Sequence, residues 1–119
     1  MRVLVVDDDP DLSMLMALVL SRQGGHEVDT AGDGVEALAL LGTSDYDIVV
    51  LDWNMPRLDG LGLCAAIRGD LQRPDLPLLM VTALPDHATA RAAGIDQVLG
   101  KPFSTSALLG AVDGLAQPA

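Results

Sequence analysis

The chain has 119 residues, half of them apolar, and its 7 basic and 17 acidic side chains give a formal net charge of −10. This length fits a single domain over residues 1–119, and the acidic balance argues against binding nucleic acid by neutralising its phosphates. The lone cysteine, Cys64, excludes an internal disulfide and is interpreted as a small packing residue, while His26 and His87 stand too far apart for a zinc site and are expected at the surface. With no signal peptide and no apolar run of membrane-spanning length, the sequence favours a cytoplasmic protein that does not bind membranes.

The first predicted element is a strand at residues 3–6, an apolar run that stops at Asp7 and Asp8. Asp9 can cap the helix that follows, and Pro10 suits its first turn, where a backbone N–H has no helical partner. The helix is expected to end at the Gly24-Gly25 pair. Helical spacing assigns four apolar side chains to its core face: Leu12, Leu15, Met16 and Val19.

Met14 and Leu18 lie at the flank of this predicted core face. They make the apolar surface of the helix wider than one core contact requires. The residues alone leave two interpretations open, a broader contact with the core or a surface on which a partner docks.

Four more strand and helix pairs follow along the chain. The predicted strands are 27–31, 48–51, 78–81 and 97–99, and the predicted helices are 35–41, 61–68, 86–93 and 105–115. Such alternation is typical of an α/β fold, here a five-stranded parallel sheet with helices on both faces. Right-handed crossovers favour the flavodoxin-like strand order 2-1-3-4-5. The helix at 86–93 offers only alanine for packing, so we expect it to be loosely held.

Polar side chains follow four of the predicted strands. Because the carboxyl ends of parallel strands share one edge of the sheet, these groups should meet: Asp7 and Asp8, Asp52, Thr82 and Lys101. Two carboxylates at about 4 Å repel by roughly 4 kcal/mol at an effective dielectric constant of 20, so a cation is expected among them. Oxygen ligands without His or Cys favour Mg²⁺, and no loop carries the calcium-binding pattern.

A cation, an ammonium and a hydroxyl around one carboxylate suit phosphoryl transfer. The cation and Lys101 would neutralise charge on the transferring group, Thr82 would donate to a phosphoryl oxygen, and Asp52 would attack as the nucleophile. The alternative is a buried ion network without chemistry, in which three carboxylates would be poorly compensated by one lysine.

Four short motifs occur in order at the ends of successive strands. They are Val-Val-Asp-Asp at 5–8, Asp-Trp-Asn-Met-Pro at 52–56 with Asp59-Gly60, Val-Thr-Ala at 81–83, and Lys101-Pro102-Phe103. Each is weak alone, but together they are specific and span essentially the whole chain. The sequence closely resembles the receiver domain of bacterial two-component response regulators, in its single-domain, chemotaxis-like form.

This resemblance implies that Asp52 accepts a phosphoryl group from the phosphohistidine of a sensor histidine kinase or phosphotransfer protein. Mg²⁺ would be bound directly by Asp8 and Asp52, partly through water by Asp7, and by the backbone carbonyl of Asn54. Phosphorylation would change binding to a downstream protein target. The chain would be a phosphoacceptor that loses its phosphate slowly by its own catalysis, rather than an enzyme with a separate substrate.

The same resemblance gives roles to the remaining residues. Thr82 and Lys101 would contact the phosphoryl group. Kinases dock beside the first helix in this family, which favours the docking interpretation for Met14 and Leu18 and adds Pro102, next to the site lysine.

Two features depart from the family pattern. An aromatic residue commonly lies three positions before the site lysine, where its rotamer reports the state of the threonine, and here that position is Val98. The segment 82–101 is also a few residues shorter than is common, at the expense of the helix at 86–93. We therefore predict that this helix is mobile or displaced, and that output depends on its disorder or on another face.

Two other classes of protein stay open. An aspartyl-phosphate phosphatase also uses a strand-end Asp nucleophile, but it needs a second Asp two residues on, where this chain has Asn54. A receiver-like binding module that takes no phosphate is kept open by Val98, although the acids, Thr82 and Lys101 are all present.

Overall fold

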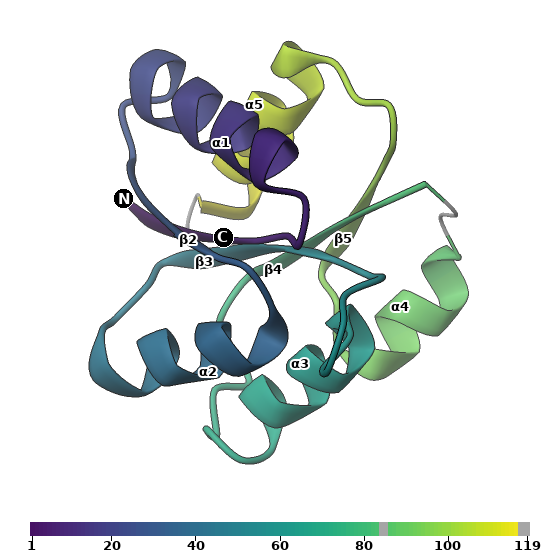
Figure 1. Cartoon of the computed structure of the whole chain (residues 1–119). Coiled ribbons are helices and arrows are strands. Elements are labelled where there is room, and N and C mark those ends of the chain that lie inside the picture. The colour runs from purple at the N-terminus through teal and green to yellow at the C-terminus, as the bar shows by residue number, and fades with distance from the viewer. Residues whose placement is uncertain (84–85, 117–119) are drawn as a thin grey trace.

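The protein is described here by a computed structural model that covers residues 1–83 and 86–116. Within these residues, five parallel strands form one sheet in the order β2-β1-β3-β4-β5, which confirms the predicted topology (Figure 1). The elements are β1 (Arg2–Val6), α1 (Pro10–Leu18), the π-helix η1 (Val19–Gln23), β2 (Glu27–Ala31), α2 (Gly34–Thr43), β3 (Ile48–Asp52), α3 (Gly60–Arg68), β4 (Leu78–Thr82), α4 (His87–Ala93), β5 (Gln97–Gly100) and α5 (Thr105–Ala116).

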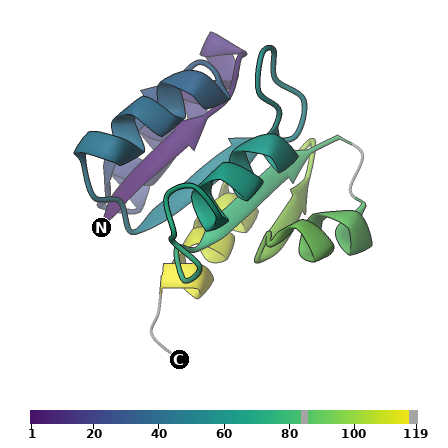
Figure 2. The same ribbon diagram turned by 90° about the horizontal axis from the view of Figure 1, so that it is seen from below.

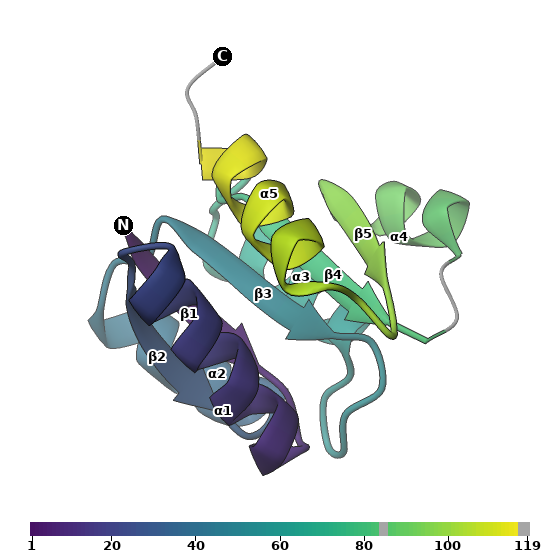
Figure 3. The same cartoon turned by 90° about the horizontal axis from the view of Figure 1, so that it is seen from above.

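Helices cover both faces of the sheet. Helices α2, α3 and α4 lie on the face seen from below, and α1 and α5 lie on the opposite face (Figures 2 and 3). Every residue of β3 and β4 is buried, as their unbroken apolar runs predict, whereas most of β2 is exposed at the edge. The buried central strands form a rigid base from which the loops at their carboxyl ends project.

The first helix differs from the prediction in which side chains it buries. Ser13 and Met16 face the sheet, whereas Leu15, assigned to the core, is 52% exposed, so that assignment is wrong. After Leu18 the chain widens into η1, where the Gly24 N–H donates to the carbonyl of Val19, five residues back. Val19 and Leu20, three and four residues after Met16, both lie in the core.

The histidine and cysteine predictions have different outcomes. His87 is exposed and Cys64 is buried, both as expected. His26, expected at the surface, has a side chain only 9% exposed, and its Nε2 lies 3.3 Å from Asp113 Oδ1. The prediction for His26 is wrong because η1 turns the chain toward α5, which covers the imidazole.

Helix α4 packs through a single alanine, as its composition predicts. Ala90 is fully buried, while the remaining helical residues are exposed or half-buried. The carboxyl end is held from α3, where Cys64 Sγ donates to the Ala93 carbonyl at 3.1 Å and Arg68 Nη2 donates to the Gly94 carbonyl at 2.7 Å. One end of α4 is therefore anchored, and its mobility stays a prediction.

Among the residues that the structure describes, no helix is long and apolar enough to span a membrane.

Candidate functional site

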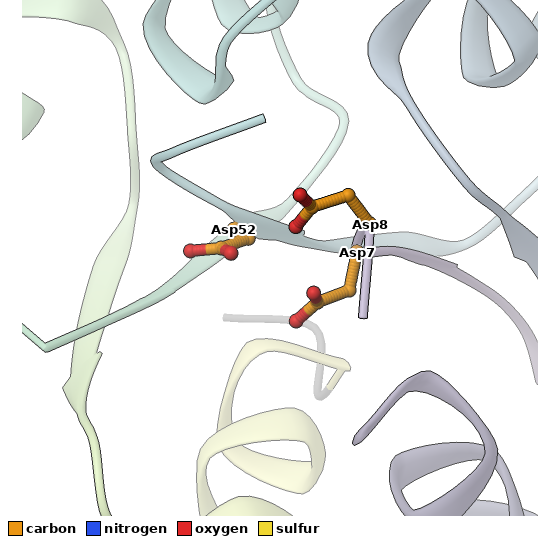
Figure 4. A group of neighbouring side chains, drawn as sticks. All are labelled: Asp7, Asp8 and Asp52. Atoms are coloured by element: carbon orange, nitrogen blue, oxygen red, sulfur yellow. The ribbon is translucent and has the colours of Figure 1, made fainter. Parts of the chain in front are cut away.

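Three carboxylates meet at the carboxyl edge of the sheet. Asp52 is the last residue of β3, and Asp7 and Asp8 directly follow β1, which pairs with β3 through Val6 and Leu51. One carboxylate oxygen from each acid lies within 4.8 Å of the others (Figure 4). Asp7 and Asp52 are buried and Asp8 is exposed, so the cluster is open to solvent on one side.

Lys101 brings the single ammonium to this cluster. Its Nζ lies 3.4 Å from Asp52 Oδ2 and 3.6 Å from Asp7 Oδ2. Its backbone N–H donates to the carbonyl of Thr82 at 2.8 Å, which ties the loop after β5 to the end of β4. The Thr82 side chain is buried at the end of β4, so the acids, hydroxyl and amine predicted to share this edge do share it.

The charge at this edge is only partly compensated. Burial, more than any other cause, raises the pKa of Asp7, and repulsion from Asp52 adds to it, while the backbone N–H of Asp9 and the Lys101 ammonium oppose the rise. The Asp9 N–H donates to Asp7 Oδ1 at 2.9 Å, whereas Asp7 Oδ2 has no hydrogen-bond partner among the described residues. A buried carboxylate oxygen in this position is a natural ligand for a cation.

The donor set fits a hard divalent cation. All three acids offer oxygen, and Asn54 lines a cavity of about 490 Å³ that opens beside Asp8. The loop that carries Asn54 folds back on its strand, because the Gly60 N–H donates to the Trp53 carbonyl at 2.8 Å, and a Cβ at Gly60 would collide with the Asp52 carbonyl oxygen. The acidic pocket could therefore bind Mg²⁺.

The three predicted docking residues are all exposed. Met14 is 64% exposed and Leu18 is 44% exposed, which rules out the interpretation that they widen the core contact. Pro102 is exposed and lines a groove of about 470 Å³ between α1 and the loop after β5. Leu15, wrongly assigned to the core, lines the same groove.

Val98 lies in the core between the sheet and the lower helices. Its side chain is 8% exposed and belongs to the same buried cluster as Ala90 of α4 and Ile95. A valine in this position fills the space between β5 and α4 without a ring that could turn out to solvent.

Sequence reasoning missed one charged pair near the site. Arg57 Nη2, in the loop after β3, contacts Asp33 Oδ2 at the start of α2. Strand periodicity gives no signal for such a contact, because both residues lie in loops. The Asp-Gly turn at 33–34 and the position of Arg57 after Pro56 indicate that both segments are loops. They do not indicate that the two loops lie close together.

Comparisons with known proteins agree with the fold and the site. The sequence matches the family model of the response regulator receiver domain over residues 3–113. It is 40% identical to the transcriptional regulatory protein TcrA of Mycobacterium tuberculosis over 98% of this chain and 46% of that protein. It is 36% identical to the chemotaxis protein CheY-3 of Vibrio cholerae over 91% of this chain and 85% of that protein. The chain thus spans about half of the length of TcrA.

A solved structure similar to this one contains a cation. The response regulator TrrA of Thermotoga maritima, in complex with Mg(2+)-BeF, superposes with a TM-score of 0.84 at 34% identity, covering 96% of this chain and 97% of that chain. Together with the match over residues 3–113, this similarity shows that the chain belongs to the response regulator receiver domain family, which is consistent with phosphoacceptor signalling.

Proposed function

We propose that Asp52 is the residue that accepts the phosphoryl group, and that a sensor histidine kinase or phosphotransfer protein supplies it as phosphohistidine. The observation that carries this assignment is the position of the Asp52 carboxylate, at 3.4 Å from Lys101 Nζ and within 4.8 Å of the oxygens of Asp7 and Asp8. No other carboxylate of the described residues ends a fully buried strand beside a lysine.

In the proposed transfer, one carboxylate oxygen of Asp52 attacks phosphorus and forms a P–O bond. The P–N bond of the phosphohistidine breaks, and its electron pair stays on the ring nitrogen, so that a neutral imidazole leaves with the proton that its other ring nitrogen already carries. The Lys101 ammonium neutralises part of the negative charge on the phosphoryl oxygens, and the Thr82 hydroxyl donates a hydrogen bond to one of these oxygens. The donor can approach through the cavity beside Asp8, which has a carboxylate oxygen within 4.8 Å of one of Asp52.

Mg²⁺ would be held by Asp8, Asp52 and the backbone carbonyl of Asn54, with Asp7 acting partly through water. Its charge would offset the repulsion among the acids and the phosphoryl oxygens. Reversal of the modification needs only a water that attacks phosphorus in line with the bond to Asp52, and the open cavity admits one.

The proposed docking surface for the kinase is the exposed side of α1 with the loop after β5. Met14, Leu18 and Pro102 supply exposed apolar area beside the site. The acidic surface of the chain favours a partner with basic residues around its own apolar contact. The same net charge supports our proposal that this domain does not itself contact nucleic acid.

A small phosphodonor such as acetyl phosphate tests the assignment without a kinase. The chain should gain the mass of one phosphoryl group with Mg²⁺ present and none with a chelator. Asp52→Asn should abolish the gain, whereas Asp59→Asn, in the same loop and still able to cap α3, should keep it. If the wild-type chain takes no phosphate, it is a receiver-like binding module, and if Asp52→Asn still takes it, another residue is the acceptor.

A further inference from the structure

The contact between Arg57 and Asp33 crosses the carboxyl end of β1, the strand that Asp7 and Asp8 directly follow. Asp33 follows β2 and Arg57 follows β3, and β1 lies between these two strands in the sheet. An ion pair between the two loops must therefore cross beside the carboxyl end of β1, where Asp7 and Asp8 begin the next loop. The loop after β3 reaches that edge beside the end of β1 (Figure 2).

The backbone at Arg57 is bent to make this contact. Its φ is +68°, in the left-handed region, and the Leu58 N–H donates to the Pro56 carbonyl at 2.8 Å, which closes a turn with Arg57 at its centre. A positive φ in a residue with a long side chain is sparsely populated and persists where other contacts hold it. The contact with Asp33 is such a contact.

The Asp33 end of the pair is fixed. Its Oδ1 accepts the Glu36 N–H at 2.8 Å, and Glu36 Oε2 accepts the Gly32 N–H at 3.0 Å, so the start of α2 is capped from both sides. Hydrogen bonding from Arg57, the largest cause, lowers the pKa of Asp33, which keeps the pair ionised at neutral pH. Two residues before Asp33, the Ala31 carbonyl accepts the Asp7 N–H at 3.1 Å.

The two loops also touch through their backbones. A Cβ at Gly34 would lie 2.8 Å from the carbonyl oxygen of Leu58, so this close approach requires glycine. Arg57 and Leu58 therefore bring the loop after β3 against α2 by one charged and one packing contact. The same loop carries Asn54, whose carbonyl is the fourth ligand of the proposed metal site.

We propose that Arg57 is a positioning residue for divalent-cation binding, acting through Asp33 to hold the loop after β3 over the acidic cluster. This inference rests on the proposed Mg²⁺ site. Arg57 touches neither the cation nor the phosphoryl group. It restrains the Asn54 backbone relative to Asp8, so that the cation meets a site that is already formed.

A positioning role for Arg57 and simple electrostatics predict opposite changes in Mg²⁺ affinity when Arg57 is removed. Removing a positive charge near three carboxylates should strengthen cation binding if charge alone matters. If Arg57 positions the loop, removing it should weaken binding. Because the Arg57 side chain is 64% exposed, the ion pair couples the two loops only weakly, and the expected loss of Mg²⁺ affinity is about two- to fivefold.

The test is a Mg²⁺ titration of the unphosphorylated chain, read by calorimetry and by the emission of the single tryptophan, Trp53, next to Asp52. Arg57→Ala should raise the Kd two- to fivefold, and Asp33→Asn, which keeps the cap of α2, should raise it similarly. The double variant should be no weaker than either single one. Arg73→Ala, which breaks the exposed Arg73–Asp45 pair, removes the same charge elsewhere and should not raise the Kd.

The outcomes separate this proposal from the one on which it rests. If the wild-type chain binds no Mg²⁺, the proposed metal site is wrong. If the wild type binds Mg²⁺ and Arg57→Ala binds it equally or more tightly, the positioning role is wrong and the metal site stands.

Discussion

The Lys101 ammonium lies 3.4 Å from the Asp52 carboxylate. Asp52 ends β3 and Lys101 follows β5, and β4 lies between these two strands in the sheet. A lysine in the loop after β5 reaches across one strand because its backbone N–H is held by the Thr82 carbonyl. The ammonium is thereby shared between Asp52 and the buried Asp7. This arrangement gives the site a fixed positive charge before any cation arrives.

Replacing this ammonium with an uncharged side chain of similar length should slow phosphorylation strongly. Lys101→Met should reduce the rate of labelling by acetyl phosphate with Mg²⁺ about a hundredfold, because a preorganised charge facing the transferring group is lost. Arg73→Met, which removes a charge at a distance, should keep the wild-type rate. A rate for Lys101→Met within twofold of wild type would show that the lysine has no role in transfer.

The only tyrosine of the chain should titrate at unusually high pH. Burial, followed by a 2.7 Å hydrogen bond to Asp29 Oδ2, raises the pKa of Tyr46 to about 12. Since the folded value lies above the unfolded value of about 10, the stabilisation is complete below pH 10 and is lost as the pH rises toward 12. Absorbance of the phenolate measures the transition, and Asp29→Asn should move it down. A midpoint near 10 in the folded chain would contradict the prediction.

Kinase docking on α1 should be separable from the chemistry at Asp52. Met14→Lys should slow phosphotransfer from the histidine kinase that labels the chain fastest, by about tenfold or more, because a charge replaces exposed apolar area at the centre of the proposed contact. Labelling by acetyl phosphate should be unchanged. Val35→Lys on α2, where the valine is 47% exposed, is the matched control. Equal transfer to both variants would place the docking surface elsewhere.

Helix α4 should exchange its amide hydrogens faster than α1. It has seven residues, of which only Ala90 is buried, and the rest of its hydrogen bonds face solvent. Hydrogen exchange followed by mass spectrometry, with and without phosphorylation, measures the difference. Protection of α4 equal to that of α1 in both states would remove the idea that output depends on the mobility of α4.

The sequence predicts the sheet and the site acids well because both depend on local patterns. Ile48–Asp52 is a buried run that ends in a charge, and parallel topology then brings Asp52 to the same edge as Lys101. The surface prediction for His26 fails because the π-turn at Val19–Gln23 redirects the chain that follows it, and no residue type indicates such a turn. Leu15 lies before that turn. Its assignment fails because the buried face of α1 carries Ser13 and Met16, and an apolar pattern leaves out a buried serine.

The contact between Arg57 and Asp33 could not be predicted for a different reason. It depends on a backbone bend at Arg57 and on the spacing of two loops set by the sheet order. Neither residue belongs to a periodic pattern. Their pairing therefore depends on the positions of both loops in the folded chain, which the sequence pattern does not give.

The π-helix takes up one residue more than a regular helical turn between α1 and β2. Deleting one residue from Val19–Gln23 would therefore restore the regular helix, and the chain would leave that turn in nearly the same direction. His26 would keep its place against Asp113, and β2 would keep its register with β1. The surplus residue is absorbed within a single turn, so the orientation of the edge strand does not depend on it.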